Sequence, residues 1–223
     1  RDAWARSDVV LYPSEIEALD VAALAPGTQA RAITPYAFAP VATSPNIASR
    51  SDVLFVAGFG HPPNIDAACW LVESVMPKVW ARRPGVALSL VGSNPTEEVR
   101  ALAGERVEVT GYVDDAELER RYRSARVAVV PLRFGAGVKS KVVEALHHGL
   151  PLVTTQVGAQ GLPGVSAVCE VTDDADAIAV AILALLDDDA LWLDRARAGH
   201  AYVMQHFSAD AMRAELARAL GLT

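Results

Sequence analysis

The chain has 223 residues, 52% of them hydrophobic, and a formal net charge of −7. This length fits one large domain or one and a half, and the apolar content suffices for a core without disulfides. The negative charge argues against nucleic acid as a general partner. Cys69 and Cys169, the only cysteines, have no metal-ligand spacing, which predicts a reduced, cytoplasmic protein. No apolar run reaches the roughly 18 residues that a membrane span needs.

Short apolar runs alternate with helical stretches along the chain. Strands are predicted at residues 9–13, 30–34, 52–58, 87–92, 107–113, 127–132, 151–155 and 167–171. Helices are predicted at residues 14–24, 64–81, 115–125 and over most of the chain after residue 172, with shorter ones after residues 95 and 137. Asn64 and Asp114 are the predicted caps of the helices that follow them. Residues 39–51 have no periodicity and are predicted to form a linker.

Most of the predicted strands are uninterrupted runs of Val, Leu and Ile, as in residues 52–58 and 127–132. Such runs are typical of a parallel sheet that is covered on both faces, whereas a half-exposed strand alternates. The strands are joined through helices by short loops. The pattern therefore predicts an α/β protein with a doubly wound, Rossmann-like parallel sheet.

The stretch FGAGVKSKVVEALHHGLPLVTT, residues 134–155, concentrates polar chemistry between two apolar strands. Gly135 and Gly137 lie where a strand ends and a helix begins. Open α/β sheets bind ligands there, and free backbone N–H groups with the helix dipole favour an anion by up to about 2 kcal/mol. Arg133 and Lys139 can add positive charge. Small residues, free amides and cations together predict a diphosphate site that needs no metal.

Two named phosphate motifs do not match this stretch. A P-loop needs Gly-Lys-Ser/Thr, but another residue separates Gly137 from Lys139. A dinucleotide fingerprint needs a third glycine, where Ser140 stands. The spacing also fits a purely structural alternative, in which Glu144 pairs with Lys141 on the solvated helix face for about 0.2–0.5 kcal/mol. From spacing alone, both interpretations stay open.

The stretch resembles the signature region of retaining glycosyltransferases of the GT-B fold, in the large family four group. The family pattern has Glu-Ala in a helix, then Gly-Leu-Pro and a strand that ends in Thr. The matching residues here are Glu144-Ala145, Gly149-Leu150-Pro151 and Val153-Thr154-Thr155. The resemblance covers roughly residues 50–220, through VLFVAG, LSLVGSNP, VEVTGYV and VGAQGL. Residues 7–19, SDVVLYPSEIEAL, are similar to the last part of the family's N-terminal domain.

The resemblance implies the C-terminal, donor-binding half of a GT-B enzyme. Residues 1–38 would be a remnant of the N-terminal acceptor domain, and residues 39–51 the linker. Residues 52–223 would be the nucleotide-sugar-binding domain with terminal cross-over helices. The chain opens on Arg1 rather than Met, so we expect a fragment whose missing acceptor domain would also supply any peripheral membrane contact.

The family pattern also implies roles for individual residues. Glu144 would hold the ribose hydroxyls, since a carboxylate can accept two hydrogen bonds from a diol. The amides of Gly137 and Val138 would face the diphosphate or the sugar, and the main chain at Tyr112 and Val113 would hold the base. The glycines of the loop GFGHPPN would border the phosphates. The full predicted nucleotide-sugar-binding set is Glu144, Gly137, Val138, Lys139, Arg133, Gly58, Gly60, His61, Tyr112, Val113 and Lys141, with no metal ligand and no assigned catalytic residue.

The sequence departs from the family pattern at two places. The family often has a second Glu eight positions before the ribose Glu, to touch the donor sugar, and here that position is Ala136. Many members also carry Arg and Lys in the loop after the first strand, to neutralise the diphosphate. The corresponding loop here, residues 58–64, has neither. We expect Arg133 and Lys139 to supply the missing charge.

The implied reaction transfers a sugar from a nucleotide diphosphate sugar to an acceptor with retention of anomeric configuration, as in bacterial polysaccharide or glycoconjugate synthesis. The leaving diphosphate would be stabilised electrostatically, without a cofactor. Because a GT-B reaction takes place between two domains, the isolated fragment is expected to be inactive. Two alternatives stay open: a non-hydrolysing sugar-nucleotide epimerase of GT-B architecture, and a nucleotide-binding subunit of a split transferase.

The sequence also allows predictions for a histidine pair and for three aromatic residues near the C-terminus. His147 and His148 are adjacent and point about 100° apart on a helix, whereas metal pairs need i,i+4 spacing, so we expect no metal there. Trp192, Tyr202 and Phe207 lie on the terminal helices. In the GT-B fold the last helix packs on the N-terminal domain, so part of this aromatic surface is expected to be bare or covered by a neighbouring molecule.

Overall fold

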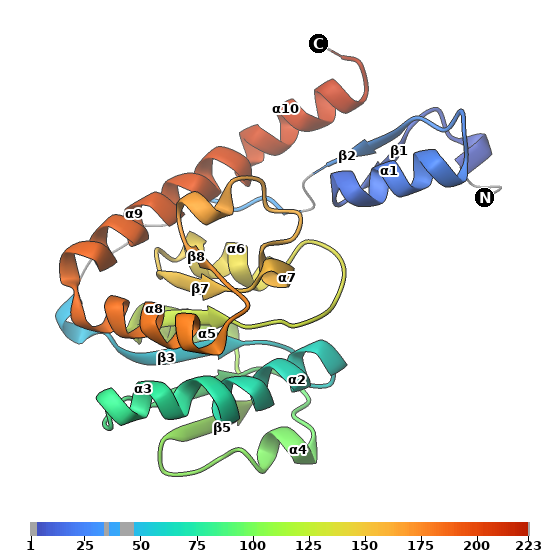
Figure 1. The fold of residues 1–223 in the computed structure, drawn as a ribbon. Coiled ribbons are helices and arrows are strands. Elements are labelled where there is room, and N and C mark those ends of the chain that lie inside the picture. The colour runs from blue at the N-terminus through green and yellow to red at the C-terminus, as the bar shows by residue number, and fades with distance from the viewer. Residues whose placement is uncertain (1–3, 34–35, 41–46, 223) are drawn as a thin grey trace.

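A computed structural model describes residues 4–33, 36–40 and 47–222 of the chain. Its main sheet contains β3 (Ser51–Val56), β4 (Leu88–Val91), β5 (Val107–Gly111), β6 (Ala125–Val130), β7 (Leu152–Thr154) and β8 (Glu170–Val171). The strand order is β5-β4-β3-β6-β7-β8 (Figure 1), and every neighbouring pair is parallel. This confirms the predicted α/β class with a doubly wound parallel sheet. Each strand predicted for this sheet is present, with ends that differ by at most three residues.

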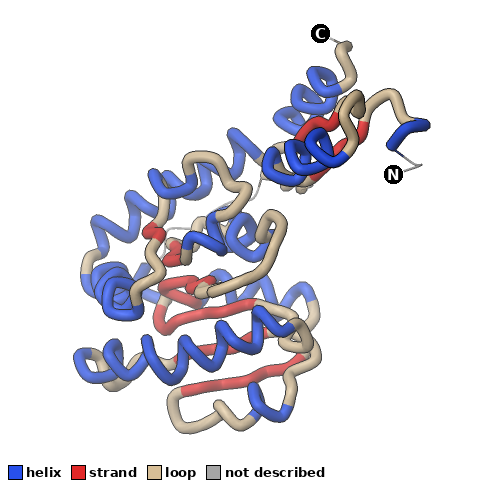
Figure 2. The backbone as a smooth tube through the Cα atoms, turned by 45° about the vertical axis from the view of Figure 1, so that its right-hand side comes forward, coloured by secondary structure: helices blue, strands red, loops and turns tan. Residues whose placement is uncertain are grey.

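Helices cover both faces of the main sheet (Figure 1, Figure 2). The helices of this domain are α2 (Pro62–Trp70), α3 (Met76–Arg82), α4 (Glu97–Arg100), α5 (Asp115–Ser124), α6 (Ser140–His147), α7 (Gln156–Ala159), α8 (Ala175–Asp187) and α9 (Asp189–His206). The last helix, α10 (Ala209–Ala219), follows α9 and extends away from the sheet (Figure 1). α3 and α8 pack together, whereas α6 packs against β6 and β7 with α9 behind it. β6 is buried along its whole length between these layers, which explains its unbroken apolar sequence.

The long helix predicted at residues 64–81 is interrupted in the structure. It starts at Pro62, and Leu71–Val75 form a π-helical turn between α2 and α3. Pro77 has no N–H and cannot continue the ordinary hydrogen-bond ladder. The N–H of Met76 donates to the carbonyl of Leu71, five residues earlier, instead of four as in an α-helix. The hydrogen bond that closes the π-helical turn therefore comes from the residue directly before Pro77.

The first part of the chain forms a separate small unit beside α10 (Figure 1). β1 (Val10–Tyr12) and β2 (Ala30–Ala32) pair in parallel, and α1 (Glu15–Leu24) connects them. Ser14 caps α1 by accepting a hydrogen bond from the N–H of Glu17. The last residue of the strand predicted at residues 30–34 lies outside the described residues. The same is true of residues 41–46 of the predicted linker.

The prediction of a bare aromatic surface on the terminal helices is wrong. Trp192, Tyr202 and Phe207 are 1%, 6% and 3% exposed. The guanidinium groups of Arg50 and Arg126 both contact the Trp192 ring, at 5.0 and 5.5 Å from its centroid. Its Nε1 also donates to the carbonyl of Arg126 at 2.6 Å. These aromatic residues therefore anchor α9 to the sheet domain, while α10 has no buried residue.

Candidate functional site

The strand order creates a switch point between β3 and β6. From β3 the chain proceeds to β4 and β5 on one side, and then crosses to β6 on the other side of β3. Open α/β sheets bind ligands outside the carboxyl ends of the strands at such a point. α2 begins there after β3, and α6 begins there after β6. The two connections lie close together, since a Cβ added at Gly135 would be 3.5 Å from the side chain of Pro63 at the start of α2.

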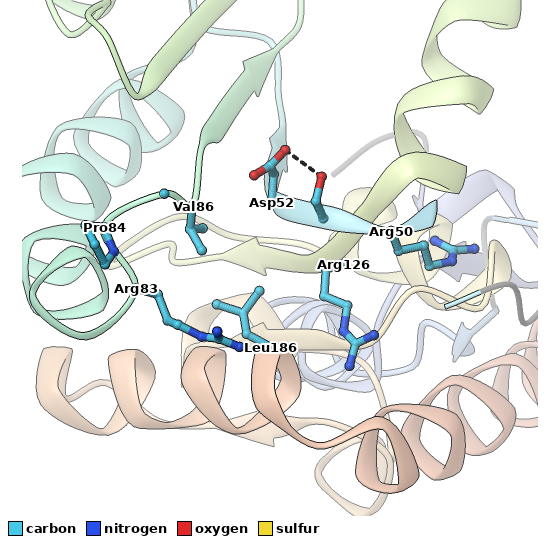
Figure 3. A pocket seen from close by; sticks show the side chains of 9 residues that line it. Arg50, Asp52, Arg83, Pro84, Val86, Arg126 and Leu186 are labelled. Carbon is cyan, nitrogen blue, oxygen red and sulfur yellow. Dashed lines mark hydrogen bonds between the residues drawn. The ribbon is translucent and has the colours of Figure 1, made fainter. Parts of the chain in front are cut away.

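A hollow of about 360 Å³ lies at the opposite end of the sheet, at the start of β3 (Figure 3). Its charged groups are already paired with protein groups. Arg83 pairs with Asp187, and Arg126 pairs with Asp189 at 2.6 Å. Arg50 donates to two backbone carbonyl groups at 2.9 and 3.0 Å. Because these bonds join α3 to α8 and β6 to α9, we interpret the hollow as structural, and the switch point remains the candidate site.

Glu144 lies on the half-buried face of α6 and is held from α5. Tyr122 Oη donates to Glu144 Oε2 at 3.3 Å, and the ring of Tyr122 stacks on His148 at 4.6 Å. Burial, and then the charge of Glu144, raise the pKa of Tyr122 well above its usual range, so the hydroxyl keeps the proton that it donates. Among the described residues Glu144 forms no ion pair with Lys141, which removes the structural alternative based on that pair.

Asn64 does not cap α2, contrary to the prediction. The helix starts two residues earlier, with His61 at the N-cap position and no side-chain cap. Asn64 is buried, and its amide nitrogen donates to the carbonyl of Gly58 at 2.8 Å. Its amide oxygen accepts from Lys141 Nζ at 2.6 Å. Burial, followed by the nearby charge of Lys139, lowers the pKa of Lys141 to about 8.

The two cations expected to neutralise a diphosphate both have protein partners. Arg133 forms a two-pronged ion pair with Asp66, with one N···O distance of 2.9 Å. Its guanidinium also lies 5.4 Å from the ring centroid of Trp70. Lys139 is 8% exposed and donates to the carbonyl groups of Ala136, at 3.0 Å, and of Gly137. Burial lowers the pKa of Lys139.

The remaining predicted residues lie in loops beyond the carboxyl ends of β3, β5 and β6. Gly58, Gly60 and His61 follow β3 and are exposed, and Tyr112 follows β5 and is 78% exposed. Gly137 has φ +78°, which other residues rarely adopt, and open space where a Cβ would be. The structure thus brings these main-chain segments to the end of the sheet where Glu144 and Lys141 lie.

Neither a metal site nor a membrane span is found in the described part of the chain. No three His, Cys, Asp or Glu side chains there are grouped so that they could hold a metal ion. His147 Nε2 instead lies 2.7 Å from the carbonyl oxygen of Ala39. No helix among the described residues is both long and apolar enough to cross a bilayer.

Comparison with known families decides the identity of the chain. The sequence model of the glycosyl transferases group 1 family matches residues 50–188, which is more than half of the chain. The chain belongs to this family. Phosphatidyl-myo-inositol mannosyltransferase of Mycolicibacterium smegmatis is 31% identical to this glycosyltransferase chain over 145 residues. That alignment covers 62% of the chain and 37% of the relative, so the chain spans about two fifths of the relative's length.

Solved structures show the same fold for this glycosyltransferase chain. Staphylococcus aureus TarM, in a complex that contains UDP, superimposes with a TM-score of 0.81 at 13% identity, over 97% of this chain and 44% of TarM. Anabaena HepE, in a complex with UDP and glucose, superimposes with a TM-score of 0.75 at 16% identity, over 99% of this chain and 65% of HepE. At these identities the likeness establishes the fold, which is that of GT-B glycosyltransferases.

Proposed function

We propose that this chain is the donor-binding half of a retaining glycosyltransferase, with its nucleotide diphosphate sugar at the switch point between β3 and β6. The observation that carries the proposal is the position of Glu144. Its carboxylate lies on the helix that starts at this point, and Tyr122 holds only one of its two oxygens. The other oxygen has no partner among the described residues, so the carboxylate can accept hydrogen bonds from a ribose diol.

Main-chain groups complete the proposed donor site. The amides of Gly137 and Val138 face the diphosphate or the sugar at the start of α6, where the helix dipole favours negative charge. The main chain after β5, at Tyr112 and Val113, holds the base. Gly58, Gly60 and His61 border the phosphates from the loop after β3.

Transfer takes place between this unit and an acceptor domain. We assign residues 1–38 to the end of that domain, residues 39–51 to the linker and residues 52–223 to the donor domain. Charge that develops on the leaving diphosphate is stabilised by fixed amides and cations, and no metal takes part. The leaving oxygen also accepts the proton of the attacking acceptor hydroxyl on the same face of the sugar, which retains the configuration. The acceptor class that we propose is a bacterial polysaccharide or glycoconjugate, and both cysteines are free, as in a cytoplasmic enzyme.

The test is a calorimetric titration of the chain with UDP, GDP and ADP, without added metal, for the parent and for Glu144→Ala. One diphosphate should bind. Loss of a hydrogen bond to a charged group costs roughly 1.5–3 kcal/mol, so the variant should bind about ten- to a hundredfold more weakly. Glu105→Ala, at an exposed loop position, is the control and should bind like the parent. A parent chain that binds none of the three, or a Glu144→Ala variant with parental affinity, would contradict the proposal.

A further inference from the structure

Lys141 connects the two chain segments that meet at the switch point. Its side chain extends from the first turn of α6 to Asn64 in the first turn of α2, with 2.6 Å between Nζ and Oδ1. Asn64 in turn donates to the carbonyl of Gly58, in the loop after β3, at 2.8 Å. The ammonium group is therefore held between the loop that follows β3 and the helix that follows β6.

The charge of Lys141 has no acidic partner among the described residues. The amide oxygen of Asn64 is neutral and accepts one of the three ammonium N–H groups, which leaves two donors for a ligand. Glu144 acts on Lys141 only through space, without an ion pair. A partly buried ammonium without a counter-ion costs free energy, and a bound anion would remove that cost.

The neighbouring cations are less available than Lys141. The guanidinium of Arg133 is already neutralised by the carboxylate of Asp66. The ammonium of Lys139 uses two of its three donors on carbonyl groups of its own loop. The loop at residues 58–64, which approaches the same point, contains neither Arg nor Lys, so the amide of Asn64 positions a cation that comes from another helix.

We propose that Lys141 is the cation that binds the diphosphate of the donor, and that Asn64 is the positioning residue that holds it there. This inference rests on the proposed function. In it, Lys141 takes the place of Arg133 and Lys139 as the cation that neutralises the diphosphate. It also explains how the chain compensates for a loop after β3 without basic residues. Burial lowers the pKa of Lys141 to about 8, so the ammonium is still charged at neutral pH.

The experiment compares the diphosphate and the monophosphate of whichever base binds, as UDP with UMP, GDP with GMP or ADP with AMP. Calorimetry at pH 7 gives the ratio of the two affinities for the parent and for each variant. Lys141→Gln keeps an N–H donor for Asn64 but loses the charge, whereas Lys141→Arg keeps the charge. Lys78→Gln is the matched control, because Lys78 pairs with Asp176 on the surface of α3. Thermal unfolding of each variant checks that the fold is kept.

Lys141→Gln should weaken the diphosphate about ten- to a hundredfold while the monophosphate changes much less, so the affinity ratio falls. Lys141→Arg should recover most of the loss, and Lys78→Gln should match the parent. Asn64→Ala should lower the ratio by a smaller factor, because an unrestrained ammonium can still reach the anion.

Three results would overturn the inference. An unchanged ratio in Lys141→Gln, with Glu144→Ala still weakening both nucleotides, would leave the donor site in place and reject the role of Lys141. A larger fall in Lys139→Gln than in Lys141→Gln would return the role to Lys139. A parent chain that binds no diphosphate would reject the proposed function, and this inference with it.

Discussion

Tyr122 Oη and Glu144 Oε2 are 3.3 Å apart, and this hydrogen bond joins α5 to the helix that carries the family signature. Tyr122 is 2% exposed, and its hydroxyl reaches the half-buried carboxylate from the protein side. The bond fixes the orientation of the carboxylate. The ribose contact proposed for Glu144 therefore depends on a residue of a different helix.

Tyr122→Phe should weaken nucleotide diphosphate binding without loss of the fold. The variant removes one long hydrogen bond, worth about 0.5–1.5 kcal/mol, which corresponds to roughly two- to twelvefold in affinity. Calorimetric titration measures the change. Tyr202→Phe is the matched control, because the Tyr202 hydroxyl is buried without a partner among the described residues and lies in α9. Equal affinities for Tyr122→Phe and the parent would show that Glu144 does not need this support.

Binding of the diphosphate should depend on pH through Lys141. Its pKa is lowered to about 8, by burial first and then by Lys139, with Glu144 opposing. Well below pH 8 the ammonium is charged, and the contribution of Lys141 to the affinity should be constant. Above pH 8 the free protein loses this proton, and affinity should fall by up to about tenfold per pH unit. Calorimetric titrations with the diphosphate between about pH 6.5 and 9.5, a range that spans this pKa, measure the dependence. The Lys141→Gln variant should lose the fall in affinity above pH 8.

The lowered pKa of Lys141 also affects stability: the free energy of unfolding should rise with pH, whereas the affinity for the diphosphate should fall. Lys141 has a lower pKa in the folded chain than in the unfolded chain, where the ordinary value of 10.5 applies. Between these two values the unfolded state binds more protons, so this group makes the free energy of unfolding rise with pH. Urea unfolding of the parent and of Lys141→Met across this window measures the contribution. A parent that shows no rise relative to the variant would contradict the lowered pKa.

Gly137→Ala should destabilise the chain through the backbone. Gly137 has φ +78°, and a Cβ there meets open space, so the cost is conformational, about 1–2 kcal/mol. Gly85→Ala is the control, since a Cβ at Gly85 also meets open space but its φ lies outside the left-handed range. That variant should be neutral or slightly stabilising. Urea unfolding distinguishes the two, and equal free energies of unfolding would show that the loop at Gly137 adapts without strain.

Trp192→Ala should be among the most destabilising substitutions in the chain. The ring is 1% exposed and lies against the guanidinium groups of Arg50 and Arg126. Its removal leaves a large cavity and two guanidinium groups without their ring contact, and we expect a loss of about 3–5 kcal/mol in the free energy of unfolding. Trp192→Phe keeps the packing but loses the hydrogen bond to the Arg126 carbonyl, so it should cost much less. Similar losses for both variants would argue against the packing account.

The parts of the fold that depend on local sequence could be predicted from it. β6 is buried along its length, and a strand covered on both faces has no polar positions to interrupt its apolar run. Asp114 caps α5 through the N–H of Glu117, as its position before a helical stretch predicts. The Glu-Ala and Gly-Leu-Pro pattern around Glu144 likewise indicated the family that the comparison then established.

The errors concern residues whose partners are distant in sequence. Asn64 has the residue type of a cap, but its amide bonds to Lys141, 77 residues away. Trp192 was expected at a bare surface, but its partners Arg50 and Arg126 lie far from it in the chain. No motif in the sequence points to Tyr122, although it is the only aromatic residue in the charged helix DAELERRYRS. A single aromatic residue in an otherwise charged helix indicates the face of the helix that packs against the protein.

A crystal structure of the chain with the diphosphate that binds it would test the central claim most directly. Our account predicts the ribose at Glu144, the diphosphate at the start of α6 near Gly137, and Lys141 Nζ within hydrogen-bonding distance of a phosphate oxygen. Density for the nucleotide at the hollow lined by Arg50, Arg83 and Arg126 would contradict it. A nucleotide at the switch point without contact to Glu144 would equally contradict the proposed site.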